Sequence, residues 1–203
     1  MAGPIVGILL AAGRGNRFGR DKLLHRLPDG MPMAIASAVN LLPACESVIA
    51  VLRPGCDHLT EQFEDIGCET VLCHAADAGM GHSLAAGVNA SQGASGWVVA
   101  LADMPFIQPA SHQAVVDNLR SGASLAASEF NGRRGHPVGF AERWRDQLVE
   151  LTGDHGGRPI IEAHRKELVL APVDDPGVLW DVDVPEDLEI YRRCRDQSNK
   201  HPS

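Results

Sequence analysis

Paired cysteines, long apolar runs and an excess of basic residues are all missing from this 203-residue sequence. The five cysteines are scattered with no Cys-x-x-Cys pair, which indicates neither a disulfide framework nor a zinc site and favours small buried side chains in a reducing compartment. No apolar stretch approaches the ~20 residues of a membrane helix. No cationic region precedes the first apolar stretch, as it would in a signal peptide. We therefore expect a cytoplasmic protein with no membrane partner.

The charge balance is acidic, with 18 Lys and Arg residues against 26 Asp and Glu residues and a formal net charge of -8. General nucleic-acid binding needs a basic face, so this balance argues against nucleic acid as a partner. A hydrophobic fraction of 44% and a length of 203 residues suit one α/β domain with a sizeable core. We expect that domain to span residues 1–195 and the polar residues 196–203 to form a disordered tail.

Apolar segments of strand length alternate with segments of helical pattern through the first half of the sequence. The expected strands are 5–10, 47–52, 69–73 and 97–101, and the expected helices between them are 33–42, 58–65 and 84–90. Such alternation predicts a mostly parallel central sheet with helices on both faces. Ligands of such sheets lie at the carboxyl ends of the strands, which here lead into residues 10–22, residues 79–83 and Asp103.

The second half is less regular and mixes strands with short helices. Helices are expected at 111–119, at 144–151 and up to 164, and strands at 123–130, 137–140, 167–171 and 178–182. A turn at 131–135 joins the first two of these strands. A final helix is expected near Pro185, a residue that suits the first turn of a helix.

Residues 10–22 form a loop rich in glycine and cations directly after the first expected strand. Glycines let backbone N–H groups approach a ligand, and cations among such groups favour a polyphosphate. The spacing does not fit a Walker A loop, because the lysine of this loop is followed by leucine. It does not fit a dinucleotide-binding loop either, because the third glycine comes one residue too late and the second strand ends in Arg53 rather than in an acid.

The loop reads Leu-Ala-Ala-Gly-Arg-Gly-Asn-Arg-Phe-Gly-Arg-Asp-Lys-Leu over residues 10–23. It resembles the signature loop of the MobA-like NTP transferase family, and most of all that of the CTP:molybdopterin cytidylyltransferase branch. Ala12 and the run 17–19 favour this branch over the guanylyl one. The resemblance extends to the Asp103 strand, a Gly-His-Pro hairpin and the C-terminal acids. It implies a single-domain Rossmann-like α/β fold with three layers, of the nucleotide-diphospho-sugar transferase type, in which the N-terminal half binds the nucleotide and the C-terminal half binds the acceptor.

Catalytic and nucleotide-binding roles are expected mainly on this loop. Lys22 and Arg17 would neutralise phosphates and are, with Asp103, the expected catalytic residues. The expected nucleotide-binding residues are Leu10, Ala11, Ala12, Gly13, Arg14, Gly15, Lys22 and Ser83. Ser83 ends a Gly-Met-Gly-His-Ser turn, where it either caps the next helix or, as the resemblance implies, contacts the base or the ribose.

Acidic residues at two places are expected to bind Mg²⁺. Asp103 follows a fully apolar strand that delivers it to the ligand edge of the sheet, although it could also only shape the turn before Pro105. Asp181 and Asp183 share one face if residues 178–182 form a strand. The alternative is that one of them caps the final helix. The resemblance implies Asp103 and Asp183 as metal ligands, with Asp181 as the further candidate.

Two segments of the second half are candidates for the acceptor side. Gly135-His136-Pro137 and the glycine-rich loop 153–158 resemble segments of the cytidylyltransferase branch. This resemblance implies that His136, Asp154 and Arg158 bind the acceptor. The alternative is that both segments only provide hairpin and loop geometry.

The resemblance implies an enzyme that transfers CMP from CTP to the phosphate of molybdopterin, with Mg²⁺ as cofactor and with release of pyrophosphate. A related NTP transferase with another nucleotide or acceptor, such as a guanylyltransferase, is the alternative. A non-catalytic maturation factor that binds nucleotide and a molybdenum hydroxylase apoenzyme is opposed by the presence of Lys22, Asp103 and Asp183. A dinucleotide-binding oxidoreductase is opposed by the loop spacing and by Arg53-Pro54.

Overall fold

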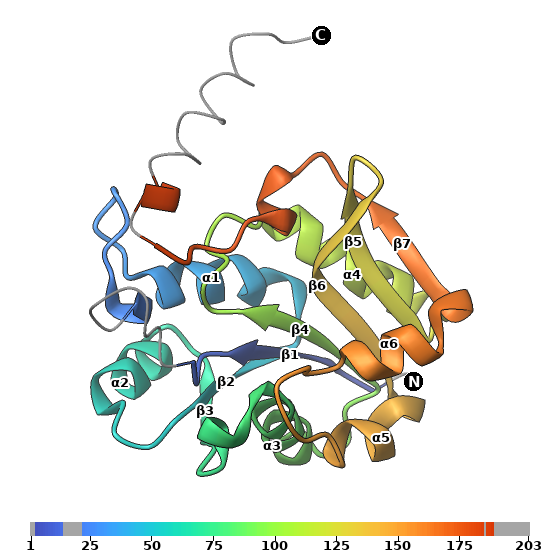
Figure 1. Ribbon diagram of the computed structural model, residues 1–203, viewed down its shortest axis with the longest axis horizontal. Coiled ribbons are helices and arrows are strands. Elements are labelled where there is room, and N and C mark those ends of the chain that lie inside the picture. The colour runs from blue at the N-terminus through green and yellow to red at the C-terminus, as the bar shows by residue number, and fades with distance from the viewer. Residues whose placement is uncertain (1–2, 14–21, 185, 189–203) are drawn as a thin grey trace, which may run out of the picture.

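One seven-stranded sheet organises the computed structural model, which describes residues 3–13, 22–184 and 186–188 (Figure 1). The strand order is β3-β2-β1-β4-β6-β5-β7. The strands are β1 (Ile5–Leu10), β2 (Ser47–Leu52), β3 (Glu69–Leu72), β4 (Gly96–Leu101), β5 (Leu125–Phe130), β6 (Arg133–Ala141) and β7 (Leu168–Pro172). Of these seven, β6 runs antiparallel to its neighbours and the others share one direction. The predicted mostly parallel sheet is therefore confirmed.

Helices lie close to where the sequence pattern predicts them. They are α1 (Met33–Leu41), α2 (Asp57–Asp65), α3 (Met80–Ala90), α4 (Pro109–Arg120), α5 (Arg145–Val149) and α6 (Arg158–Ala163). In α4, for example, the buried Val115, Val116 and Leu119 recur at helical spacing, and Pro109 stands in the first turn, where its missing N–H costs nothing. Two 3-10 turns, η2 (Lys22–Leu24) and η7 (Pro176–Leu179), flank the site described below.

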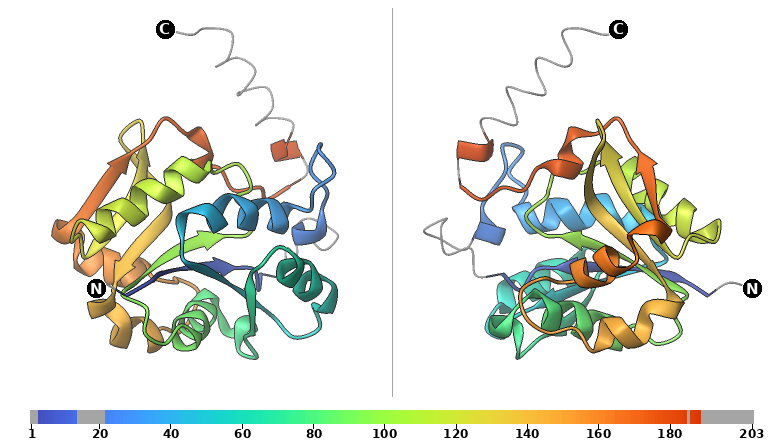
Figure 2. Two further views of the ribbon diagram at one scale, coloured as in Figure 1. Left: turned by 180° about the vertical axis from the view of Figure 1, so that it is seen from behind. Right: turned by 45° about the vertical axis from the view of Figure 1, so that its right-hand side comes forward.

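Helices cover both faces of the sheet, because its central strands are apolar on both sides. In β1, Ile5 and Leu9 belong to a core with α1, α2 and α4, whereas Val6 and Ile8 belong to a core with α3, α5 and α6. The views of Figure 2 show α1 and α4 on one side of β1 and β4, and α3 and α5 on the other. The predicted three-layer Rossmann-like arrangement is confirmed.

The strand predicted at 178–182 is wrong, because the chain turns there instead of extending. The cause is Asp175, whose carboxylate is 98% buried and accepts three hydrogen bonds. The donors are the backbone N–H groups of Gly177 and Gln108, at 2.9 and 2.8 Å, and the hydroxyl of Ser111, at 2.6 Å. These bonds start η7 and tie it to the beginning of α4, so the segment leaves the direction of the sheet.

The turn predicted at 131–135 is shorter than expected, because β6 already begins at Arg133. Asn131 and Gly132 form the connection, and both have positive φ angles, of 51° and 76°. Asn-Gly is the sequence that best tolerates this backbone geometry in a two-residue hairpin. The hairpin itself is confirmed, and Gly135 and His136 lie within β6, where its pairing with β5 is irregular, rather than in a loop.

The cysteines of the described ranges behave as core residues. Cys56, Cys68 and Cys73 are buried, Cys45 is half-buried, and none of these four takes part in a disulfide bond. Burial raises the pKa of the Cys68 thiol to about 11, so it is a poor nucleophile. Across residues 3–13, 22–184 and 186–188, no helix combines the length and the apolar character that crossing a bilayer requires. The predicted tail, 196–203, lies outside the described residues.

Candidate active site

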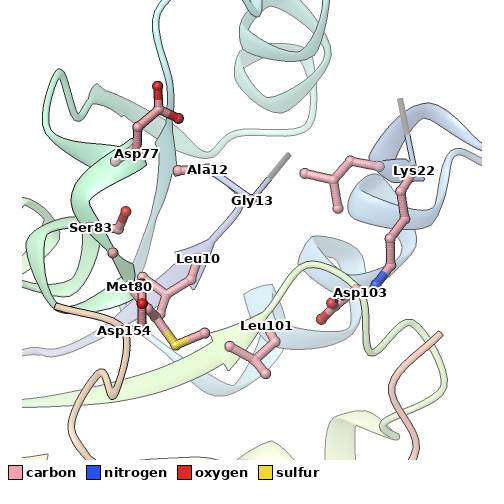
Figure 3. A pocket seen from close by; sticks show the side chains of 13 residues that line it. Leu10, Ala12, Gly13, Lys22, Asp77, Met80, Ser83, Leu101, Asp103 and Asp154 are labelled. Carbon is pink, nitrogen blue, oxygen red and sulfur yellow. Dashed lines mark hydrogen bonds and ion pairs between the residues drawn. The ribbon is translucent and has the colours of Figure 1, made fainter. Parts of the chain in front are cut away.

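A cavity of about 470 Å³ opens at the carboxyl ends of β1 and β4, where the sequence predicts a ligand (Figure 3). We call it the β1–β4 cavity. Seven of the predicted site residues line it: Leu10, Ala12, Gly13, Lys22, Ser83, Asp103 and Asp154. In Figure 3, Lys22 and Asp103 form one side of the cavity, and Ser83 lies on the opposite side.

The Lys22 side chain joins two of the predicted metal ligands. Its ammonium nitrogen lies 2.9 Å from Oδ2 of Asp103 and 2.9 Å from Oδ1 of Asp183. Only 6% of Lys22 is exposed. Burial by itself would lower the pKa of Lys22, but the charges and hydrogen bonds of the two carboxylates outweigh burial and raise that pKa. The side chain is therefore a fixed cation in the wall of the cavity at neutral pH.

Backbone hydrogen bonds bring Asp183 to this cation. The N–H of Val182 donates to the carbonyl oxygen of Asp103 at 3.0 Å, which fastens the C-terminal segment to the end of β4. The carboxylate of Asp187 then accepts from the N–H groups of Asp183 and Val184, at 2.7 and 2.9 Å. Asp103 and Asp183, which the resemblance implies as joint metal ligands, therefore meet at Lys22, although the strand expected just before Asp183 does not form.

Gly135 allows a close approach that this arrangement needs. A Cβ atom at Gly135 would lie 2.1 Å from the carbonyl oxygen of Val178, so no side chain fits there. The absence of a side chain lets η7 pass directly against β6 and positions the segment that continues to Asp183. Part of the Gly-His-Pro segment thus provides geometry, which is one of the two interpretations the sequence left open.

Asp103 and Asp183 suit a divalent cation by their chemistry, because their oxygens already share one cation, the Lys22 ammonium. Mg²⁺ commonly takes one or two carboxylates and completes its shell with substrate phosphates and water. Asp181 lies nearby: burial and the charges of Asp183 and Asp103 raise the pKa of its carboxyl group. Within the described ranges, no three His, Cys, Asp or Glu side chains are arranged to hold a metal, so substrate oxygens would have to contribute. The metal role of these three acids stays a prediction.

The predicted nucleotide-binding residues divide into three groups. Leu10, Ala12 and Gly13 line the cavity, whereas Ala11 is buried and its N–H donates to the carbonyl oxygen of Val51 at 2.9 Å. The predicted residues Arg14, Gly15 and Arg17 lie outside the described ranges.

Ser83 is not a helix cap, so that interpretation of the sequence is wrong. The helix α3 begins at Met80 with Gly79 as its N-cap, and Ser83 is 96% buried inside the helix. The helix begins earlier than the sequence pattern predicts because Gly79 has a φ of 127°. This backbone conformation suits glycine and ends the preceding turn. Ser83 still lines the cavity, which agrees with the other interpretation, contact with a nucleoside.

Arg53 is a site residue to which the sequence analysis assigned no role. It follows β2, and its Nη1 donates to the carbonyl oxygen of Gly13 at 2.8 Å. It thereby fixes the main chain where the glycine-rich loop leaves the sheet. The sequence does carry a signal for this role, because Arg53 stands where a dinucleotide-binding fold would have an acid. The sequence analysis used this arginine only to exclude that fold.

A second cavity, of about 230 Å³, lies beside the first, between β6 and the start of α6. We call it the β6–α6 cavity. His136 and Arg158, two of the predicted acceptor-binding residues, line it, and Arg134 and His155 add further basic groups. Asp154, the third predicted acceptor-binding residue, lines the β1–β4 cavity instead. Val138 and Phe140 provide apolar walls.

His136, which lines this cavity, interacts electrostatically with a second histidine, His112. His112 of α4 is 98% buried, and within the part of the chain that the structure describes the Nδ1 atoms of His112 and His136 have no hydrogen-bond partner. Burial, with a contribution from the charge of His136, lowers the pKa of His112 to about 4. Burial also lowers the pKa of His136, although the nearby Asp103 carboxylate works in the opposite direction. Both rings are therefore neutral at pH 7.

We expect His112 to make the fold sensitive to acid. Its pKa is about 4 in the folded protein and about 6.5 in an unfolded chain, so the unfolded state binds more protons between these values. Stability that is fully present above pH 6.5 is then lost as the pH falls toward 4, by about 3 kcal/mol from this residue. Urea denaturation at pH 7 and pH 4.5 measures the loss. His112→Phe should reduce the difference between the two pH values, whereas His58→Phe, at an exposed position, should not; equal differences in both variants would contradict the assignment.

Residues 7–168 match the model of the MobA-like NTP transferase domain family. Among curated relatives, the purine catabolism protein PucB of Bacillus subtilis is 28% identical over 94% of this chain and 97% of its own length. Nicotine blue oxidoreductase of Paenarthrobacter nicotinovorans is 28% identical over 93% and 95%. A protein described as a probable molybdenum cofactor guanylyltransferase of Nostoc sp. is 28% identical over 98% and 96%.

Solved structures agree with the sequence match. Rv0371c from Mycobacterium tuberculosis H37Rv superposes with a TM-score of 0.79 at 26% identity, covering 95% of this chain and 97% of that chain. The Rv0371c complex with manganese gives a TM-score of 0.77 at 25% identity, over 94% and 97%. Because the family model covers most of the chain, the chain belongs to the MobA-like NTP transferase family and is a nucleotidyltransferase.

Proposed function

We propose that this nucleotidyltransferase transfers CMP from CTP to the phosphate of a molybdopterin-type acceptor. The observation that carries the proposal is the Lys22 ammonium between Asp103 and Asp183, in the wall of a cavity that Ala12 and Gly13 also line. A fixed cation beside paired carboxylates and exposed loop backbone suits a triphosphate that arrives with a metal ion.

The β6–α6 cavity supports the acceptor half of the proposal. Arg134 and Arg158 give it a basic lining that suits an anionic group, while Val138 and Phe140 suit a flat ring. The guanylyltransferase relative is named for the molybdenum cofactor, which supports an acceptor of the molybdopterin class. CTP is proposed over GTP because the methyl group of Ala12 lines the β1–β4 cavity, where the guanylyl branch tends to carry glycine and so leaves more room.

The chemistry requires one bond to form and one to break. An oxygen of the acceptor phosphate attacks the α-phosphorus of the NTP, the bond from this phosphorus to the oxygen bridging to the β-phosphate breaks, and pyrophosphate leaves with the bonding electrons. Lys22 holds positive charge beside the phosphates, and Arg53 holds the loop backbone at Gly13. Mg²⁺ held by Asp103 and Asp183 would stabilise negative charge on the phosphate oxygens.

An oxidoreductase is the second candidate, because one relative carries that name. A dinucleotide-binding site of the usual kind needs a carboxylate after the second strand to bind the ribose. Here β2 is followed by Arg53, which is bonded to the carbonyl oxygen of Gly13. The β1–β4 cavity is therefore better suited to a triphosphate than to the ribose of a dinucleotide.

Pyrophosphate release tests the proposal. The protein is incubated with each of the four NTPs and Mg²⁺, with and without molybdopterin, and with NAD(P)H in parallel. We expect release with CTP that depends on molybdopterin. Release with GTP instead would overturn the nucleotide assignment, and nucleotide binding without release would favour the maturation factor that serves a molybdenum hydroxylase apoenzyme. Oxidation of NAD(P)H without pyrophosphate release would overturn the transferase proposal.

A further inference from the structure

Three apolar side chains line both cavities: Leu10, Met80 and Leu101. Leu10 ends β1 and Leu101 ends β4, and the two residues are paired neighbours in the sheet. Met80 begins α3, and in Figure 3 its side chain extends toward Leu101. We call these three residues the apolar seam, because the β1–β4 cavity and the β6–α6 cavity meet along them.

Main-chain packing fixes Met80 at the seam, although 42% of this residue is exposed. The N–H of Gly81 donates to the carbonyl oxygen of Gly153 at 2.8 Å. A Cβ atom at Gly79 would lie 2.2 Å from the carbonyl carbon of Gly153, so the start of α3 lies directly against the glycine-rich loop. On the other side of that loop, a Cβ atom at Gly156 would lie 3.1 Å from the sulfur of Met80. The Met80 backbone is thus held between two glycines in contact with the loop, and its sulfur lies close to Gly156 of the same loop.

The seam lies where two nucleophiles compete for the same phosphorus. In the proposed function, the α-phosphate lies near Lys22 and the acceptor enters from the side of Arg158, so the attacking oxygen must cross the seam. Attack by the acceptor phosphate gives the dinucleotide product and pyrophosphate. Attack by water, with loss of one proton, gives NMP and pyrophosphate. Apolar side chains at the crossing offer water no hydrogen-bond partner, and thereby disfavour the second reaction.

We propose that Met80 is a specificity-determining residue that directs nucleotidyl transfer to the acceptor and away from water. The inference rests on the proposed function, because it assigns a role to the boundary between the two substrate sites. The methionine side chain suits this role because it is long, apolar and conformationally adaptable. It can cover the seam when the acceptor is absent and pack against the acceptor when it is bound.

Product partition tests the proposal. NMP and dinucleotide are quantified separately for the wild type, Met80→Ala and Met80→Leu, with CTP, Mg²⁺ and molybdopterin. We expect Met80→Ala to raise the ratio of NMP to dinucleotide about tenfold or more, because water gains access to the phosphorus. Met80→Leu should restore a low ratio, since leucine again covers the seam. Leu72→Ala is the matched control: Leu72 is also an exposed apolar residue, at 50%, but lies on β3 and lines neither cavity, so its ratio should equal that of the wild type. An unchanged ratio in Met80→Ala would overturn the proposal.

A binding measurement separates this inference from the proposed function. Methionine labelled with ¹³C at its ε-methyl group gives a resolved signal for Met80, assigned by its loss in Met80→Leu. We expect this signal to shift on addition of CTP and, separately, on addition of a pterin carrying a phosphate monoester, whereas the signal of the buried Met104, which lines neither cavity, should not. If the Met80 signal shifts with both ligands but the protein releases no pyrophosphate, the proposed reaction is rejected. The position of Met80 at the boundary of the two substrate sites is then retained. Transfer with no response of Met80 to either ligand would keep the reaction and reject the role of Met80.

Discussion

Replacing Lys22 by methionine is expected to lower the turnover of nucleotidyl transfer by about 10²- to 10³-fold or more, the usual cost of losing one fixed charge-stabilising group. The side chain is buried, and its ammonium is the cation that two carboxylates hold at the wall of the β1–β4 cavity. Methionine keeps the length of the side chain and removes the charge. The loss should appear mainly in kcat, since charge that develops in the transition state is what the ammonium stabilises.

The control for this variant is Lys166→Met, at an exposed lysine of the 3-10 turn before β7, which should leave turnover unchanged. Circular dichroism and thermal unfolding establish that both variants are folded. A folded Lys22→Met protein with the turnover of the wild type would show that the cation is not needed for the reaction.

Metal binding without nucleotide gives a second readout for Lys22. In the wild type the ammonium neutralises Asp103 and Asp183, so a free divalent cation must compete with it. In Lys22→Met this ammonium no longer lies between the two carboxylates, and we expect Mn²⁺ to bind about tenfold more tightly, a change of ~1.4 kcal/mol. Electron paramagnetic resonance titration of free Mn²⁺ measures this difference. Equal affinity in the two proteins would mean that the two acids do not form the metal site.

The first half of the fold could be predicted because its local patterns and its tertiary arrangement agree. β1 is six residues of apolar sequence that end at a glycine-rich loop, and the alternation that follows leaves few topologies other than a parallel sheet with helices on both faces. The same logic placed Asp103 at the ligand edge, because a charged residue directly after a buried strand must lie at its end. Lys22 was predicted from its charge and its place in the glycine-rich loop, and the structure adds that its partners are acids.

The C-terminal segment could not be predicted from local pattern, because long-range hydrogen bonds decide its path. Residues 178–182 have the composition of a strand, but Asp175 is bonded to Gln108 and Ser111, more than 60 positions away in the sequence. The approach of Val178 to Gly135 depends equally on the tertiary fold. The sequence therefore predicted which acids meet but not the backbone that brings them together.

Met80 and His112 were missed for a different reason. A methionine at the start of a helix and a histidine within one are ordinary residues in sequence, and neither has a partner at a fixed spacing. Their importance comes from position: Met80 lies between two cavities, and His112 interacts electrostatically with His136, which is distant in the sequence. The Gly-Met-Gly run carried a signal in hindsight, because two glycines around one large side chain indicate close backbone packing on both sides.

Asp103→Asn is expected to separate catalysis from stability. The change removes the negative charge and keeps an oxygen that can accept the hydrogen bond of Lys22, at a position where 29% of the side chain is exposed. We expect turnover to fall by about 10²- to 10³-fold, because metal affinity and charge stabilisation both depend on the carboxylate. The free energy of unfolding should fall by only about 1 kcal/mol, since Asp183 and the asparagine oxygen still accept hydrogen bonds from the Lys22 ammonium.

Asp175→Asn is the matched variant, because it makes the same chemical change at a carboxylate that lines neither the β1–β4 nor the β6–α6 cavity. Asp175 is only 2% exposed, and an asparagine there would turn an N–H₂ group toward N–H or O–H donors that now bond to a carboxylate. We expect a loss of about 2 to 4 kcal/mol in the free energy of unfolding, measured by urea denaturation. If Asp103→Asn instead destabilised the protein as much as Asp175→Asn while turnover stayed near that of the wild type, Asp103 would be a structural residue, and the metal-dependent mechanism would lose its central carboxylate.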